Sequence, residues 1–339
     1  MAVYTTIDDS EAYFQVKLYT GNNTAIGSGG LANTFDGDTD MSPNLVWIKA
    51  RADTESHKLY DSVRGVTKDL ESDLNTLENT NTEGLTTFGS DGFTIGNYSS
   101  INANTQTYVA WCWKESATSG FDIVTATGTG SAKTIAHSLS AVPHLIISKE
   151  KSGSVNDWVI YHHKNTSAPE TDKIILNEVN ATSDDSCWND TTPTSSVFSV
   201  SGASVTNRTS STYVYYLFSE KQGFSKFGTY EGNGNANGTF INLGFKPMYF
   251  LLKSSSHGES WSIYDIKRQT YNPVSYYFPA ANTNAAEATS ASYAMDFLSN
   301  GIKLRGAGTG INGYGYTYIY AAFADNPFVN SKGVPCNAR

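Results

Sequence analysis

Three segments of this 339-residue chain repeat one another, and this repetition constrains the fold more than any other feature of the sequence. Each begins with a proline, continues with apolar residues and ends with a lysine six places after the proline: PNLVWIK at 43–49, PHLIISK at 143–149 and PMYFLLK at 247–253. A tyrosine follows each proline after 17, 18 and 17 residues, respectively: Tyr60, Tyr161 and Tyr264. Such matched spacing indicates three copies of one structural unit.

A third segment recurs downstream in each copy. It reads TYVAWCWKE at 107–115, TYVYYLFSE at 212–220 and YTYIYAAFA at 316–324. We place the seams between the copies near 116–119 and 220–222 and define three modules. They are module 1 (residues 1–117), module 2 (118–221) and module 3 (222–339).

The apolar runs within each module are short, rich in Val, Ile, Tyr, Phe and Trp, and bounded by Gly, Asn, Ser and Asp. This pattern is typical of strands in a sandwich or barrel. In module 2 it predicts strands at 121–126, 133–137, 143–148, 157–162, 173–177, 195–200 and 212–219. The predicted fold is all-β, with three tandem β-sandwich modules, jelly-roll or concanavalin-like, of about 100 residues each.

One stretch of module 1 has a different periodicity. In DSVRGVTKDLESDLNTLENTN at 61–81, Leu70, Leu74 and Leu77 recur at helical spacing. We therefore expect a short helical insertion in module 1, packed on its strands.

The aromatic strand YVAWCWK at 108–114 has two interpretations. Side chains alternate across a strand, so Val109, Trp111 and Trp113 share one face, which could be a sugar-binding platform or part of a core. The same phase of large or branched apolar residues recurs in the other two modules. One core explains that recurrence, whereas a platform would have to arise in each module, so we predict that both tryptophans are buried.

The net charge of −9, without a cluster of Lys and Arg, argues against nucleic acid as a partner. No apolar run reaches the length of a transmembrane helix and the start lacks the pattern of a signal peptide, so we expect no membrane insertion and folding in the cytoplasm.

Neither a GxGxxG nor a Walker pattern occurs, and the three cysteines lack metal-site spacing. We expect no cofactor and no metal.

Several long stretches of the chain resemble a known family. They are MAVYTTIDDSEAYFQVKLYTG at 1–21, NLVWIKARADTESHKLYDSVRG at 44–65, SDGFTIG at 90–96, YVAWCWKES at 108–116 and YIYAAFADNPF at 318–328. They are similar to repeat-built structural proteins encoded by tailed phages of marine bacteria, including cyanophages and pelagiphages. The resemblance implies a virion component, called a tail fibre or structural protein, and it supplies no catalytic residues.

A phage protein of this kind would assemble in the host cytoplasm with other virion proteins, as a homo-oligomer. Two roles remain open: a fibre or adhesin that contacts the host envelope, and a decoration or connector on the capsid or tail. The chain has no sustained heptad repeat, which moves weight towards a compact knob or decoration.

The alternative is a phage enzyme that degrades glycans, which would need two carboxylates facing each other across a groove. The candidates are Asp61, Asp122, Glu170, Asp172 and Asp265. Histidines that could suggest a metal are His137, His144, His162 and His163. Neither set lies in a recognisable motif, so we expect no catalytic residues.

Recognition by surface loops is the better prediction. The loop GTGINGYGYTY at 308–318 contains Tyr314 and Tyr316, and NPVSYYFPAANTN at 272–284 contains Tyr276 and Tyr277. Tyrosine offers a large amphipathic contact at low entropic cost, so these four residues are candidates to contact a glycan on the host surface or a neighbouring subunit. Packing between strands is the competing explanation for each of them.

Overall fold

Short apolar stretches form strands along the whole chain. In the computed structural model, which describes residues 4–277 and 281–336, the fold is all-β and sandwich-like, with antiparallel sheets. All seven strands predicted for module 2 are present, within a few residues of the expected bounds. Among the described residues no helix is long and apolar enough to cross a membrane.

Each module contributes a main sheet with the same order of its first four strands. In module 1 this sheet contains, in spatial order, β1 (Phe14–Thr20), β9 (Thr107–Trp113), β3 (Leu45–Ala50) and β4 (Lys58–Asp61). In module 2 it contains β10 (Phe121–Thr127), β17 (Thr212–Phe218), β12 (Leu145–Ser152), β13 (Val159–His162), β14 (Asp172–Ile175) and β15 (Ser183–Asp184). In module 3 it contains β18 (Ser225–Glu231), β26 (Thr317–Pro327), β20 (Phe245–Ser254) and β21 (Ser262–Asp265).

A smaller sheet covers the outer face of each main sheet. These sheets are β2 (Leu31–Asn33), β8 (Phe93–Ile95) and β7 (Leu85–Phe88) in module 1, β11 (Lys133–Ala136) and β16 (Val197–Val200) in module 2, and β19 (Phe240–Asn242), β25 (Gly301–Leu304) and β24 (Met295–Leu298) in module 3. Short pairs are β5 (Lys68–Asp69) with β6 (Asn79–Thr80) and β22 (Tyr276–Tyr277) with β23 (Ala288–Thr289). The short helices before the central strands are α1 (Ser99–Asn102), α2 (Ser204–Asn207) and α3 (Thr309–Asn312). Single 3-10 turns lie at Ile26–Ser28, Pro169–Thr171, Ser186–Trp188 and Ala291–Tyr293.

The helical insertion predicted for 61–81 is wrong. The segment consists of turns and the β5–β6 pair, and its leucines do not share a face: Leu70 is buried and bridges Leu59, whereas Leu74 is exposed. The main-chain carbonyls of Glu71 and Leu74 accept hydrogen bonds from the indole of Trp158 in module 2. A helix would use such carbonyls internally, so this contact between modules replaces the local helical pattern.

The tryptophans of the aromatic strand are buried, as predicted, with Trp111 0% and Trp113 3% exposed. Their strand, β9, lies inside its sheet between β1 and β3, and both of its faces are covered. The face with Tyr108, Ala110 and Cys112 packs on the smaller sheet of module 1. Burial on both faces explains why the strand is apolar at nearly every position.

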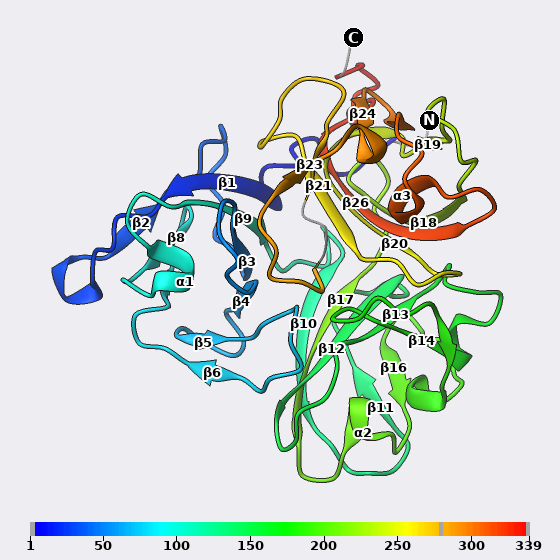
Figure 1. The fold of residues 1–339 in the computed structure, drawn as a ribbon. Helices are drawn as coiled ribbons and strands as arrows, with labels where there is room; N and C mark the ends of the chain where they lie inside the picture. The colour runs from blue at the N-terminus through cyan, green and yellow to red at the C-terminus, as the bar shows by residue number, and fades with distance from the viewer. Residues whose placement is uncertain (1–3, 278–280, 337–339) are drawn as a thin grey trace.

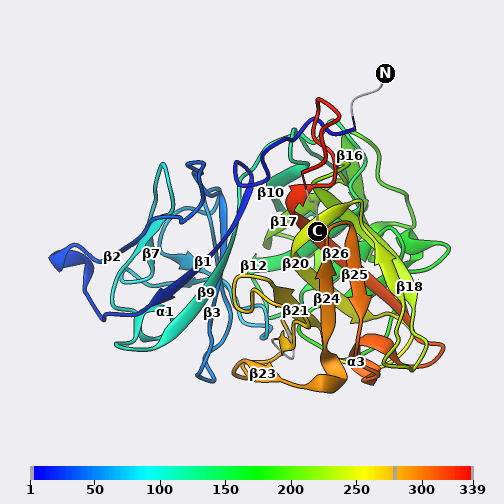
Figure 2. The same cartoon turned by 90° about the horizontal axis from the view of Figure 1, so that it is seen from above.

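The opposite faces of the three main sheets meet in one hydrophobic core. Figures 1 and 2 show module 1 in blue and cyan, module 2 in green and module 3 in yellow to red around this common centre. Trp113, Phe218 and Phe323 are spaced 105 residues apart, and their ring centroids lie 5.6 to 6.3 Å from one another. The repeated strand therefore supplies one aromatic side chain per module to a shared centre.

The lysine of each repeated segment has a structural role. Lys49, Lys149 and Lys253 are fully buried, and each ammonium donates to main-chain carbonyls. Lys149 also reaches Asn75 O of module 1, and Lys253 reaches Val179 O of module 2. Burial lowers the pKa of all three amines to about 8. The equivalent lysines are therefore buried and bound to main-chain carbonyls in all three modules.

Candidate functional site

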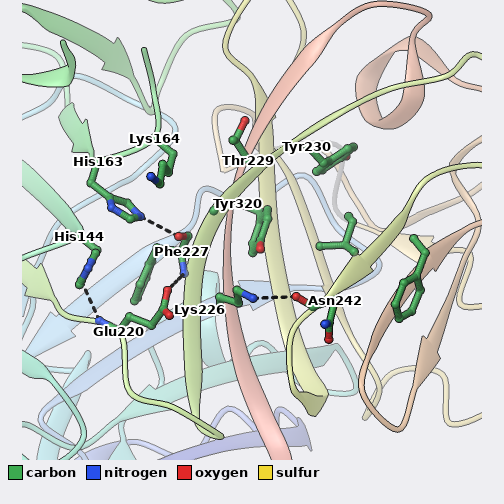
Figure 3. A pocket seen from close by; sticks show the side chains of 13 residues that line it. His144, His163, Lys164, Glu220, Lys226, Phe227, Thr229, Tyr230, Asn242 and Tyr320 are labelled. Carbon is green, nitrogen blue, oxygen red and sulfur yellow. Dashed lines mark hydrogen bonds between the residues drawn. The ribbon is translucent and has the colours of Figure 1, made fainter. Parts of the chain in front are cut away.

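Three of the four candidate histidines come together where module 2 meets module 3. The ring centroids of His144 and His163 are 4.4 Å apart, and those of His162 and His163 are 5.5 Å apart. His163 Nε2 donates to Phe227 O at 2.7 Å, and His144 Nδ1 accepts from Glu220 N at 2.9 Å (Figure 3). Burial lowers the pKa of His144 to about 4 and that of His162 to about 3. These rings are neutral hydrogen-bonding groups near pH 7.

His137 lies apart from this group and hydrogen-bonds Thr194 O. Among the residues that the structure describes, no set of three His, Cys, Asp or Glu side chains is arranged to hold a metal ion.

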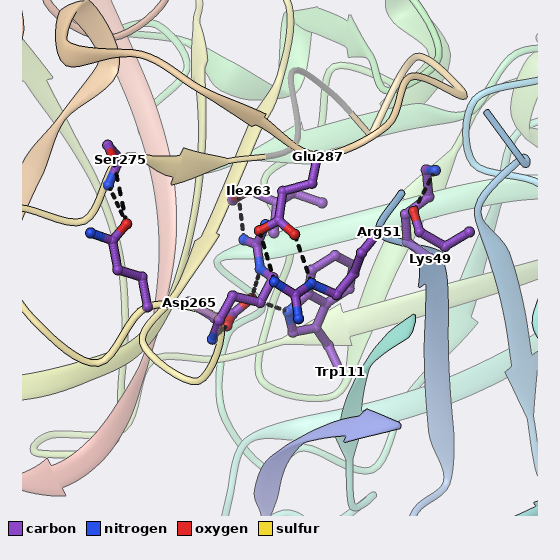
Figure 4. Close-up of polar contacts among 10 residues, drawn as sticks. Lys49, Arg51, Trp111, Ile263, Asp265, Ser275 and Glu287 are labelled. Atoms are coloured by element: carbon purple, nitrogen blue, oxygen red, sulfur yellow. Dashed lines mark hydrogen bonds and ion pairs between the residues drawn. The ribbon is translucent and has the colours of Figure 1, made fainter. Parts of the chain in front are cut away.

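The candidate carboxylates Asp61 and Asp265 occupy equivalent repeat positions and make equivalent contacts between modules. Tyr216 of module 2 donates its hydroxyl to Asp61 Oδ2 of module 1 at 2.7 Å. Trp111 of module 1 donates its indole N–H to Asp265 Oδ2 of module 3 at 3.0 Å (Figure 4). Both carboxylates are fully buried, and each hydrogen bond joins two modules.

The middle copy has His162 at this position, and the structure supplies the reason. Residues 111, 216 and 321 are equivalent, but residue 321 is alanine and has no side-chain donor. His162 is itself the donor, from Nε2 to Tyr320 O of module 3 at 3.0 Å. The third junction therefore has the same kind of contact with the direction of donation reversed.

Arginines complete the two carboxylate contacts. Arg64 pairs with Asp61, and Arg268 pairs with Asp265 at 2.6 Å, each three residues further along the chain. Glu287 binds Arg268 and also Arg51 of module 1, as Figure 4 shows for Arg51. Each buried carboxylate is thus neutralised by a fixed guanidinium, an arrangement suited to structure.

The remaining candidate carboxylates lie in module 2. Asp122 is buried and accepts from Ser138 N at 2.5 Å. Burial, with the hydrogen bond and charge of Asp122, raises the pKa of Glu115 to about 7. Glu170 lies in a 3-10 turn and Asp172 begins β14, where its carboxylate accepts from the hydroxyl of Thr166.

The four candidate tyrosines have different environments. Tyr277 is buried and stacks on Tyr293, with ring centroids 4.7 Å apart, so it packs locally. The side chain of Tyr276 lies outside the described part of the structure. Tyr316 is half-buried and stacks on His257 at 3.5 Å, whereas Tyr314 is 85% exposed.

The loop that contains Tyr314 and Tyr316 is one copy of a repeated motif that sequence reasoning missed. In each module an asparagine precedes the leading tyrosine of the central strand by six residues: INANTQTY at 101–108, TNRTSSTY at 206–213 and INGYGYTY at 311–318. This exact repetition is the signal that could have identified the motif.

Each asparagine of the motif connects three loops. Asn207 Nδ2 donates to Ser201 O and Ser131 O, both at 2.7 Å, and its Oδ1 accepts from Thr129 N. Asn312 makes the three corresponding bonds in module 3, and Asn102 makes two of them in module 1. The leading tyrosines, Tyr108, Tyr213 and Tyr318, clamp the same turn through their hydroxyls. We call this arrangement the Asn–Tyr clamp.

Module 3 differs from the other modules in the residues that the clamp does not need. Tyr314 and Tyr316 take the positions of Asn104 and Gln106 in module 1 and of Thr209 and Ser211 in module 2. The fold tolerates small polar side chains there, so packing does not require the tyrosines. The exposed Tyr314 lies against Gly234 of the polar 232–237 loop, and Tyr316 stacks on the exposed His257; we call these three side chains the module 3 tip.

The described residues form an all-β protein with three fused sandwich-like modules, and module 3 exposes Tyr314 at its tip. The chain belongs to the family described as "Domain of unknown function (DUF7483)", whose model matches residues 9–327. No curated protein and no solved structure matches the chain.

Proposed function

We propose that this chain is a non-enzymatic structural protein on the outer surface of a tailed-phage virion, where it serves as a tail-fibre head, knob or capsid decoration. It assembles with other virion proteins as a homo-oligomer. It contacts host-surface glycan or a neighbouring subunit through the module 3 tip. The similarity of its long motifs to phage structural proteins supports the placement on the virion.

One observation carries the non-enzymatic assignment. Three buried side chains that could perform chemistry, Asp61, Asp265 and His162, are groups that join the modules. Their hydrogen bonds to neighbouring modules leave them no access to a substrate. The exposed Tyr314 of the module 3 tip makes no such contact between modules, and an exposed tyrosine suits recognition.

The placement is tested by a reconstruction of the phage particle, with the chain fitted to the density. We expect three sandwich-like lobes on the outside of the tail or capsid. Absence of the chain from purified virions would overturn the assignment as a virion protein.

The recognition role is tested by competition. Purified protein is expected to bind host cells and slow phage adsorption, and the Tyr314→Ala variant to do so less well, with Asn104→Ala at the equivalent position of module 1 as the control. Equal activity of both variants would exclude the module 3 tip.

An enzyme assay tests the catalytic alternative. The protein is incubated with host-surface glycan and the reducing ends are measured, with Glu115→Gln and Asp122→Asn as variants. We expect no release. Release that either variant abolishes would establish a glycan-degrading enzyme instead.

A further inference from the structure

A cavity of about 510 Å³ lies at the junction of modules 2 and 3, next to the histidine group. Module 2 contributes His144, His163 and Lys164, and module 3 contributes β18, β19 and Tyr320 (Figure 3). The volume falls within the range of sites that bind small molecules. Nothing in the inter-module contacts described above requires this space.

The lining is positively charged in a chain whose net charge is −9. Lys164 and Lys226 are its cations and Glu220 is its acid. Glu220 accepts a hydrogen bond from Phe227 N, and Lys226 donates to Asn242 O at 2.8 Å. The exposed Lys164 ammonium has no hydrogen-bond or ion-pair partner among the residues that the structure describes. A ligand with a negative charge is therefore favoured.

The edge of β18 adds main-chain groups to the cavity. Alternate residues of an edge strand direct N–H and C=O away from the sheet. Phe227 O accepts from His163 and Glu231 O accepts from Thr239, so both residues point outward. Thr229 lies between them and lines the cavity, which places its N–H and C=O there. This edge suits a ligand that carries both donors and acceptors, as hydroxyl groups do.

Phe240 provides an apolar face in the cavity lining. It is 43% exposed at the start of β19. A flat aromatic ring beside hydrogen-bonding groups and a cation fits a sugar ring that bears a carboxylate.

The other junctions show that the fold does not need these lysines. The registers of β1, β10 and β18 make Gln15, Asp122 and Lys226 equivalent, so the position holds an amide, an acid and a base in turn. Likewise, Lys164 corresponds to Val63 in module 1 and to Lys267 in module 3. The combination of both lysines with the aromatic ring is specific to the junction of modules 2 and 3.

We propose that this cavity binds a carboxylate-bearing saccharide of the hexuronic acid class. Lys164 pairs with the carboxylate, Lys226 adds positive charge to the lining, the main chain of Thr229 binds hydroxyl groups, and Phe240 packs against a sugar ring. This binding site is separate from the module 3 tip and does not depend on the place of the chain in a virion.

Titration calorimetry of the full chain with trigalacturonate tests this site, with galactotriose as the neutral probe and inorganic phosphate as the simple anion. We expect trigalacturonate to bind and the other two probes to bind at least tenfold more weakly. Equal binding of galactotriose, equal binding of phosphate, or no binding of trigalacturonate at millimolar concentration would each overturn the proposal.

Variants locate the site. Lys164→Gln and Phe240→Ala are each expected to weaken trigalacturonate binding about tenfold, which corresponds to about 1.4 kcal/mol. Lys267→Gln, at the equivalent position of module 3, is the matched control and should bind like the unchanged chain. Both altered residues are partly exposed, so the variants should melt like the unchanged chain. Unchanged affinity in both site variants would contradict the assignment.

Discussion

Residues at equivalent repeat positions make the same kind of contact between modules with different chemical groups. A buried contact crosses each junction, but its donor is an indole, a phenol or an imidazole according to what the facing strand offers. The aspartates work where the neighbouring module supplies a donor. His162 replaces them where the neighbour presents only a carbonyl. The identity of a residue is thus set by its partner in another module.

Removing one donor measures such a contact. Tyr216→Phe deletes the hydroxyl that binds Asp61 and leaves the ring in place. We expect a loss of about 1.5–3 kcal/mol in the free energy of unfolding, because the bond is buried and its acceptor is a carboxylate paired with Arg64. Denaturant unfolding gives the value. Tyr314→Phe is the control, expected to stay within about 0.5 kcal/mol; an equal effect of both variants would contradict the role of the contact.

The buried histidines make stability depend on pH. Burial lowers the pKa of His162 to about 3, so the unfolded chain binds its proton first as the pH falls below 6.5. The stability that neutral His162 provides is complete above pH 6.5 and decreases below it. Glu115 acts in the opposite direction, because its pKa is raised to about 7 and the folded chain gains that proton first.

We therefore compare variants between pH 7 and 5 by denaturant unfolding. From pH 7 to pH 5, the free energy of unfolding of the His162→Gln variant should fall by about 2 kcal/mol less than that of the unchanged chain. Glu115→Gln should lose more than the unchanged chain. Identical pH dependence of all three proteins would show that neither group titrates differently in the fold.

The Asn–Tyr clamp fixes the same loop in all three modules. In each module the buried asparagine amide hydrogen-bonds main-chain groups of the turns before the central strand, where strand pairing is absent. Two residues of the loop between the asparagine and the tyrosine differ in every copy, and module 3 has the exposed Tyr314 and the half-buried Tyr316 there.

Mutation of the asparagine should have the same effect in each module. Asn102→Ala, Asn207→Ala and Asn312→Ala each remove several buried hydrogen bonds and leave their partners unsatisfied. We expect a loss of about 3 kcal/mol in each case, measured by denaturant unfolding. The exposed Asn104→Ala, two residues after the first clamp, should change little. A loss of stability in only one of the three asparagine variants would show that the clamps are not equivalent.

The whole molecule is held by one core that belongs to no single module. The inward faces of all three main sheets lie in the same hydrophobic cluster. Separating the modules would expose Val109, Trp111 and Trp113 in module 1 and their counterparts elsewhere. Each large apolar side chain contributes about 1.5–3 kcal/mol on burial, so the cost of separation would exceed the stability of an ordinary domain.

We expect the chain to unfold as one unit. Calorimetry should show a single transition, and a fragment of residues 118–221 should not fold cooperatively, because the face with Val214, Tyr216 and Phe218 would lie open to water. Circular dichroism of the fragment checks the second expectation. Separate transitions for the three modules, or a cooperative melt of the fragment, would contradict the shared core.

The repeats, the strand positions of module 2 and the burial of the tryptophans could all be predicted from the sequence, since turn residues and alternation are local patterns. It misled at 61–81, where contacts with Trp158 outweigh the helical spacing of the leucines. It indicated four candidate tyrosines in two loops but could not distinguish the buried Tyr277 from the exposed Tyr314. What covers the tryptophan face, and why His162 differs from the aspartates, could be seen only in the three-dimensional fold. Those contacts join residues that lie far apart in the chain, and no local pattern records them.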